Sequence, residues 1–262
     1  MADVQLSVVE RQLGAVYDAM HAARAGTTIV GDLYGQAMGD LYPVEVDASS
    51  CSDWALLGSM VANLRMRPGQ RLVDVGCGTG GVGLWLARAL AVSVSGVDVS
   101  ATALSLAIGR AGEFGLPVER VEFRVGSLGS TGLPAQFADG LVCVDALGHE
   151  KDRRRALEEI RRVLRPGARA VLTSGRSRVS PALPPWSEQA QGTGLILEAE
   201  EERPHEPVVW QRVYRSWVEH EAGLREQLGH AQVDSMLTEA RTRGPELRNR
   251  VAVIVTLRRP EV

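Results

Sequence analysis

Hydrophobic positions in the central part of the chain alternate between short apolar runs and longer stretches with helical periodicity. The apolar runs predict strands over residues 71–75, 92–97, 121–125, 141–146 and 168–174. The stretches between them predict helices over residues 81–91, 102–113 and 151–164, the last ended by Arg165-Pro166-Gly167. Repeated strand and helix units are typical of a parallel sheet that is buried on both faces.

Helical patterns flank this core on both sides. Residues 4–20 place apolar side chains at intervals of three and four, and Asp53 is a candidate N-cap of a helix that ends near residue 67. Beyond prolines 181, 184 and 185, residues 195–202 form a candidate sixth strand and residues 251–257 a closing strand. Residues 208–228 and 231–243 are charged and periodic, and an excursion this long between two strands predicts a helical lid.

Together these elements predict one α/β domain with a doubly wound, mostly parallel, seven-stranded Rossmann-like sheet. A chain of 262 residues is long enough for one such core with an elaboration. The expected parts are an N-terminal helical flap (1–67), a Rossmann-like core (68–202), a helical lid inserted before the last strand (203–250) and the closing strand (251–262).

Charge and cysteine content narrow the possible partners. A net charge of -3 and a pI near 6.0 argue against nucleic acid or an anionic membrane, and favour a small-molecule partner. Three cysteines without CxxC spacing predict neither a disulfide framework nor a metal site. Charges interrupt the first 23 residues and no apolar run approaches about 20 residues. We therefore expect a cytoplasmic protein, with no indication of its oligomeric state.

A glycine-rich turn follows the first predicted strand. Residues 76–81 read Gly-Cys-Gly-Thr-Gly-Gly, and glycine at a strand-to-helix turn lets the backbone approach a ligand closely. The glycines alone also satisfy the dinucleotide pattern, which leaves a nicotinamide cofactor open. Asp74 argues against a pyrophosphate, because a carboxylate repels phosphate and attracts an ammonium group. Asp98, at the end of the next apolar run, can accept hydrogen bonds from ribose hydroxyls.

The chain resembles the class I S-adenosylmethionine-dependent methyltransferases from Trp54 to about Ser174. Residues 73–80 and 96–100 resemble the first two family motifs, and residues 139–147 and 164–167 the fourth strand and the turn before the fifth. The resemblance implies S-adenosylmethionine as cofactor, with Asp74 on its ammonium group and Asp98 on its ribose. The other cofactor contacts implied are Gly76, Cys77, Gly78, Thr79, Gly80, Val99, Ser127, Leu128 and Asp145.

Candidates for chemistry follow the fourth predicted strand, at the edge of the sheet where ligands of such folds bind. Methyl transfer is an in-line displacement, so alignment and exclusion of water matter most and acid-base help is optional. His149 is a candidate general base, since an unperturbed histidine has a pKa of about 6.5. Its alternative roles are to cap a helix or to line the cofactor pocket.

An aromatic stripe marks the predicted lid. Trp210, Tyr214 and Trp217 share one helix face, which either packs into a core or lines a pocket for a flat or apolar substrate. Tyr34 in the flap is a further pocket candidate, whereas packing is the favoured role of Tyr17.

The leading hypothesis is methyl transfer from S-adenosylmethionine to a small-molecule acceptor of secondary metabolism. One alternative keeps the cofactor but folds a polyketide-like substrate through a cyclisation. Another is a nonenzymatic subunit that binds S-adenosylmethionine, which the intact Asp74 and Asp98 disfavour. A nicotinamide oxidoreductase is disfavoured by Asp74.

Overall fold

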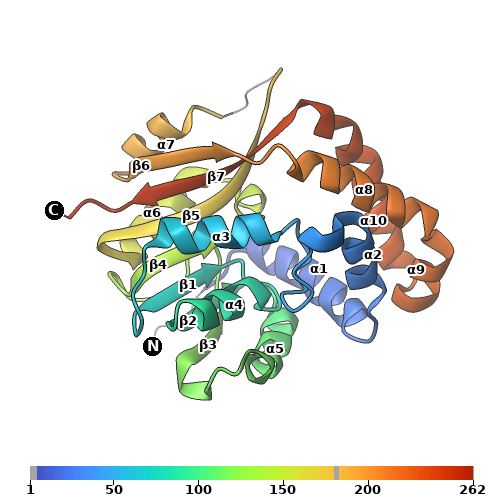
Figure 1. The fold of residues 1–262 in the computed structure, drawn as a ribbon, viewed down its shortest axis with the longest axis horizontal. Helices are drawn as coiled ribbons and strands as arrows, with labels where there is room; N and C mark the ends of the chain where they lie inside the picture. The colour runs from blue at the N-terminus through green and yellow to red at the C-terminus, as the bar shows by residue number, and fades with distance from the viewer. Residues whose placement is uncertain (1–4, 180–182, 262) are drawn as a thin grey trace.

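The computed structural model describes residues 5–179 and 183–261, so Val4, Pro181 and Val262 lie outside the described part. Within it, seven strands form one sheet in the order β3-β2-β1-β4-β5-β7-β6 (Figure 1). The strands are β1 (Arg71–Val75), β2 (Ser93–Asp98), β3 (Val121–Val125), β4 (Ala138–Cys143), β5 (Leu164–Ser177), β6 (Ile196–Glu202) and β7 (Arg250–Arg258). Strand β7 is antiparallel to both neighbours and the other pairings are parallel. The mostly parallel, seven-stranded sheet expected from the sequence is confirmed.

Two strand boundaries differ from the sequence prediction for local reasons. Strand β4 ends at Cys143, because the chain turns at Asp145, which has a left-handed φ of 52°. Strand β5 begins directly after the preceding helix, and its pairing with β4 jumps from Leu164 to Arg169. The predicted turn around Pro166 and Gly167 is therefore an irregularity within the strand.

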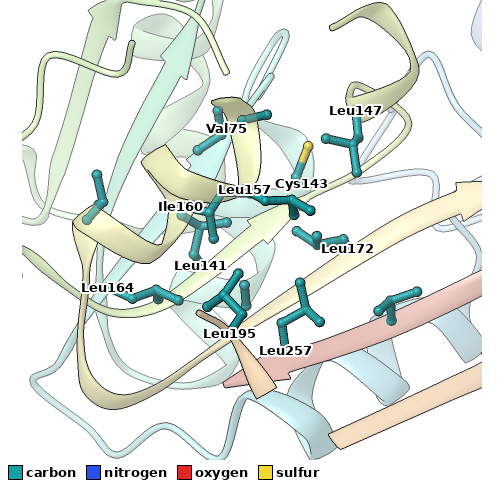
Figure 2. Close-up of a cluster of buried hydrophobic side chains, with 14 of the residues drawn as sticks. Val75, Leu141, Cys143, Leu147, Leu157, Ile160, Leu164, Leu172, Leu195 and Leu257 are labelled. Atoms are coloured by element: carbon teal, nitrogen blue, oxygen red, sulfur yellow. The ribbon is translucent and has the colours of Figure 1, made fainter. Parts of the chain in front are cut away.

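Helices cover both faces of the sheet, as in a doubly wound fold. One face is covered by α3 (Trp54–Leu64) and α4 (Gly81–Ala89), and the other by α6 (Arg153–Val163) and α7 (Trp186–Gly192). Figure 2 shows the second face, where leucines of β4, β5 and β7 meet Leu157 and Ile160 of α6. Helix α3 begins at the predicted N-cap, since Asp53 accepts a hydrogen bond from the Leu56 amide at 2.6 Å.

Helix α3 of the predicted flap (residues 1–67) covers the sheet, but the first two flap helices and the lid pack against each other and form one helical cap. It consists of α1 (Val8–Arg24), α2 (Ile29–Met38), α8 (Glu206–Glu219), α9 (Glu221–Leu228) and α10 (His230–Arg243), which gather beyond one end of the sheet (Figure 1). Buried side chains of α2, including Leu33 and Tyr34, share a core with Val213, Trp217 and Leu237 of the lid. The single helix predicted over residues 208–228 is interrupted at His220, the residue between α8 and α9.

Shorter elements complete the chain. Helix α5 (Ala101–Arg110) follows β2 and contacts both β2 and β3. The 3-10 helices are η1 (Gly39–Leu41), η2 (Ala111–Phe114), η3 (Val118–Arg120), η4 (Leu147–His149) and η5 (Gly244–Asn249). In the described residues, no helix has both the length and the hydropathy required to cross a bilayer.

Candidate functional site

The glycine turn (residues 76–81) connects β1 to α4 in a conformation that requires glycine. Gly76, Gly78 and Gly80 have φ values of 73°, 51° and 77°, in the left-handed region. A Cβ atom on Gly76 would lie 2.2 Å from the Ala146 side chain, so the backbone of the turn passes directly beside the end of β4. The turn is hydrogen-bonded to β2, because the Gly76 amide donates to the Val97 carbonyl at 2.7 Å.

Asp74 is a buried carboxyl group without a cationic partner in the described structure. It is 2% exposed at the end of β1. Burial and then the nearby Asp98 raise its pKa to about 7, and only a hydrogen bond from the Gly83 amide opposes this. Such a group is well suited to bind a cationic ligand, since an ammonium group would supply the missing counter-charge.

Asp98 stands beside the turn at the end of β2. Its Oδ2 accepts from the Gly78 amide at 2.8 Å, and its Oδ1 accepts from the Ser100 amide at 2.9 Å. A carboxylate has about four acceptor positions, so it can also accept from a ligand such as a ribose diol. Burial raises the pKa of this carboxyl group despite these bonds.

A cavity of about 960 Å³ joins the glycine turn to the helical cap. The cofactor residues expected from the sequence that line it are Asp74, Gly76, Cys77, Gly78, Thr79, Asp98, Val99, Ser127, Leu128 and Asp145. The expected pocket residues that line it are Tyr34, Trp210, Tyr214 and Trp217, together with His149. Gly80 was also expected to contact the cofactor, but it does not line the cavity. It lies against Ala107 and Phe123 within the fold.

Helix α1 lies directly over the glycine turn and the end of β2. A Cβ atom on Gly14 would be 2.7 Å from the Val99 carbonyl oxygen, and His21 approaches Gly78. Asp18 accepts from the Ser100 hydroxyl at 2.7 Å and from the Thr102 amide at 2.9 Å, which fixes α1 to the start of α5. The flap therefore closes the side of the cavity that lies over the turn.

Tyr17 and His149 form a polar pair inside the cavity. The Tyr17 hydroxyl lies 3.0 Å from His149 Nε2. Burial, followed by the charge of Asp98, raises the pKa of Tyr17 to about 12, so the hydroxyl keeps its proton at pH 7. Which of the two groups donates the hydrogen bond depends on the tautomer of His149. Burial and the nearby Arg243 lower the pKa of His149, which leaves the ring neutral at pH 7.

The position of Tyr17 differs from the packing role that the sequence favoured. Leu13, Tyr17, Met20, His21 and Arg24 all line the cavity from one face of α1. Their spacing of three and four residues is visible in the sequence. The polar side chains on this helix face were the sequence feature that could have indicated a role in a site. Only the fold shows that this face meets the glycine turn.

Asp145 places a second carboxyl group at the end of β4. The Thr173 hydroxyl donates to its Oδ1 at 2.8 Å, whereas Oδ2 is buried and has no hydrogen-bond partner within residues 5–179 and 183–261. The residue holds a left-handed φ of 52° next to Ala146, which touches the glycine turn. A strained residue with an unsatisfied acceptor in a cavity is typical of a functional position.

The aromatic residues of the cap serve both packing and the cavity. Tyr34 is edge-on to Trp210 and Trp217, with ring centroids 6.1 and 6.4 Å apart. Tyr34, Tyr214 and Trp217 are each less than 9% exposed, yet all line the cavity. The indole nitrogen of Trp217 is buried and has no hydrogen-bond partner in the part of the chain that the structure describes. The stripe therefore belongs to the core of the cap and to the wall of the site at once.

Cys77 has no features of a reactive thiol. Burial, together with Asp74 and Asp98, raises its pKa well above the ordinary value. Its sulfur lies 3.7 Å from the Gly78 carbonyl oxygen within the turn. Its small side chain fits beneath Gly96, where an added Cβ would lie 2.9 Å from the sulfur.

Comparison with known proteins agrees with this geometry. Residues 73–172 match the family model described as a methyltransferase domain. An O-methyltransferase of Pyrenophora dematioidea is 36% identical over 40% of this chain, and the match spans only 39% of that protein's length.

Two solved structures share the fold over nearly the whole chain. The [4+2]-cyclase SpnF has a TM-score of 0.74 at 23% identity, covering 96% of this chain and 97% of its own. The geranyl diphosphate C-methyltransferase of Streptomyces coelicolor has a TM-score of 0.68 at 17% identity, covering 98% of this chain and 100% of its own. At these identities the likeness establishes the architecture and leaves the reaction open.

The seven-stranded sheet, the glycine turn and the family match define a class I methyltransferase fold. The family match covers residues 73–172, so this part of the chain is similar to a methyltransferase domain, and the fold of nearly the whole chain is shared with solved structures of that architecture.

Proposed function

We propose that this protein transfers a methyl group from S-adenosylmethionine to a small-molecule acceptor. The observation that carries the proposal is the single cavity in which the cofactor residues of the sheet face the polar and aromatic residues of the cap. One shared cavity would bring a cofactor and an acceptor together, and a displacement at a methyl carbon requires that alignment.

The residues around the glycine turn fit the cofactor. S-adenosylmethionine, when bound, supplies an electrophilic methyl group on a sulfonium sulfur. Asp74 would hold its ammonium group, since this buried carboxyl group lacks a cation. Asp98 would accept bonds from the ribose with its remaining acceptor positions. Val99, Ser127 and Leu128 line the same cavity and would border the adenine end.

The cap residues favour a flat acceptor with a hydroxyl group. Tyr34, Trp210 and Trp217 offer aromatic surface on which a planar molecule can pack. His149 has a lowered pKa and so can accept the proton that a hydroxyl loses when its oxygen is methylated. The O-methyltransferase relatives are consistent with an oxygen acceptor. A hydroxylated aromatic compound of secondary metabolism fits this description.

The direct test uses S-adenosylmethionine with an isotopically labelled methyl group and a panel of hydroxylated aromatic compounds. We expect labelled methyl ether and S-adenosylhomocysteine to appear in equal amounts. The matched control is His149→Ala, which keeps the residues around the glycine turn. Cofactor binding without label transfer to any compound that binds the cavity would refute the proposed reaction.

A cyclisation of a folded substrate is the second candidate. It is favoured by the SpnF likeness, which extends over the cap as well as the sheet. The large aromatic-lined cavity suits a substrate that must be folded for ring closure. The two reactions differ in mass balance, because a cyclisation leaves the product isomeric with its substrate and the cofactor unconsumed.

Cofactor affinity should depend on pH through Asp74. The pKa of the free carboxyl group is about 7, and a bound ammonium group would favour its ionised form. Binding then releases a proton below pH 7, so affinity for S-adenosylhomocysteine should fall about tenfold for each pH unit below 7. Calorimetry between pH 5.5 and 8, in two buffers of different ionisation enthalpy, measures both the affinity and the released proton. A pH-independent affinity would exclude Asp74 as the ammonium partner.

A further inference from the structure

Arg24, at the end of α1, is a cation in the cavity that has no acidic partner at ion-pair distance among the described residues. Its Nη1 donates to the Ser49 hydroxyl at 2.9 Å, and its Nε is buried without a hydrogen-bond partner in the described structure. Burial lowers the pKa of this guanidinium. A desolvated charge that lacks a counter-ion is unfavourable, so a ligand anion is the expected complement.

The location of Arg24 indicates which anion that is. One helical turn earlier, His21 lies over Gly78, so this part of α1 covers the glycine turn. Its partner Ser49 belongs to the segment that follows Val46, and the Val46 carbonyl abuts Gly81 at the start of α4. His21 and Ser49 therefore connect Arg24 to the end of the cavity next to the glycine turn, where Asp74 is also found, while Tyr34 and Glu239 act on it from the cap.

The acids on the cap side of Arg24 are engaged elsewhere. Glu239 of α10 accepts from the Tyr214 hydroxyl at 3.0 Å and lies 3.7 Å from Arg243. Asp47 accepts from the Tyr42 hydroxyl at 2.9 Å. Both influence Arg24 through space without forming an ion pair with it.

We propose that Arg24 is the counter-ion of the α-carboxylate of S-adenosylmethionine, and that this contact holds α1 closed over the bound cofactor. The inference rests on the proposed function, because it presumes that cofactor. Asp74 would then hold the ammonium group from the sheet and Arg24 the carboxylate from the flap. Since Asp18 and Gly14 fix the same helix at Ser100 and Val99, the whole helix closes as one unit.

The test compares two ligands that differ only in the carboxylate. They are S-adenosylhomocysteine and its decarboxylated form, S-adenosyl-3-thiopropylamine, titrated into the full chain at pH 8. Wild type should prefer S-adenosylhomocysteine by about 10- to 100-fold, the effect of a charge-assisted hydrogen bond. Arg24→Gln should lose that preference and bind the decarboxylated ligand as wild type does, whereas Arg24→Lys should keep part of it. Arg11→Gln, an exposed arginine on the same helix, is the matched control and should behave as wild type.

Hydrogen exchange of the α1 amides supplies a second readout. We expect S-adenosylhomocysteine to slow exchange in residues 8–24 of wild type, and the decarboxylated ligand to have little effect. The proposal would be overturned if Arg24→Gln kept the wild-type ligand preference or lost affinity equally for both ligands. Equal protection of α1 by both ligands would also overturn it. If the wild type binds neither ligand, the proposed function itself is refuted. If the wild type binds both ligands but its affinities do not depend on Arg24, only the role of Arg24 is refuted.

Discussion

Replacement of Asp74 by asparagine should weaken S-adenosylhomocysteine binding by about 30- to 1000-fold at pH 8, the loss expected when one partner of a buried charged pair is removed. The same variant should be more stable than wild type at pH 8. The folded protein holds this carboxyl group at a pKa of about 7, against an ordinary value of 3.8. Ionisation therefore opposes folding, and its removal should raise the free energy of unfolding by up to about 4 kcal/mol.

The sign of the stability effect follows from the raised pKa. Below about pH 4 the carboxyl group is protonated in the folded and unfolded states, so the two proteins should be equally stable. The difference grows from pH 4 to pH 7 and is constant above it. Thermal melts at pH 5 and pH 8, with calorimetric titration at pH 8, measure both effects. If Asp74→Asn binds S-adenosylhomocysteine with wild-type affinity, the ammonium group of the ligand binds elsewhere.

Replacement of His149 by alanine should lower kcat by about 100- to 10,000-fold, the usual contribution of a general base. Cofactor affinity should change little, because the glycine turn and its acids are left intact. In wild type, activity should fall as the pH drops through the pKa of His149, which lies below the ordinary 6.5 because of burial and Arg243. The alanine variant should lose this acidic limb of the rate profile.

Two further variants separate a base from a residue that only lines the cavity. Tyr17→Phe keeps the ring and removes the hydroxyl that lies 3.0 Å from His149 Nε2, so the acidic limb should shift if His149 is the base. His220→Gln alters an exposed histidine between α8 and α9 and should leave rate and profile unchanged. If His149→Ala retains wild-type kcat, proximity and orientation alone sustain the reaction.

Periodicity predicted most of the sheet because buried parallel strands are short apolar runs with clear boundaries. Strands β1 and β3 begin and end as expected, at residues 71–75 and 121–125. Helix α7 (Trp186–Gly192) was not foreseen, since it lies among the prolines that indicated a break in the chain. The interruption at His220 was also missed, because the apolar pattern continues through it.

The sequence by itself determined the sheet, the glycine turn and the acids Asp74 and Asp98, because each depends on local spacing along one strand-turn-helix unit. Tertiary structure alone decided which face of α1 meets that unit. It paired Tyr17 with His149, which are 132 positions apart, and brought Arg24 to Ser49. It also packed the first two flap helices against the lid to form one cap. Contacts between distant segments depend on how separate helices pack, and no local periodicity carries that information.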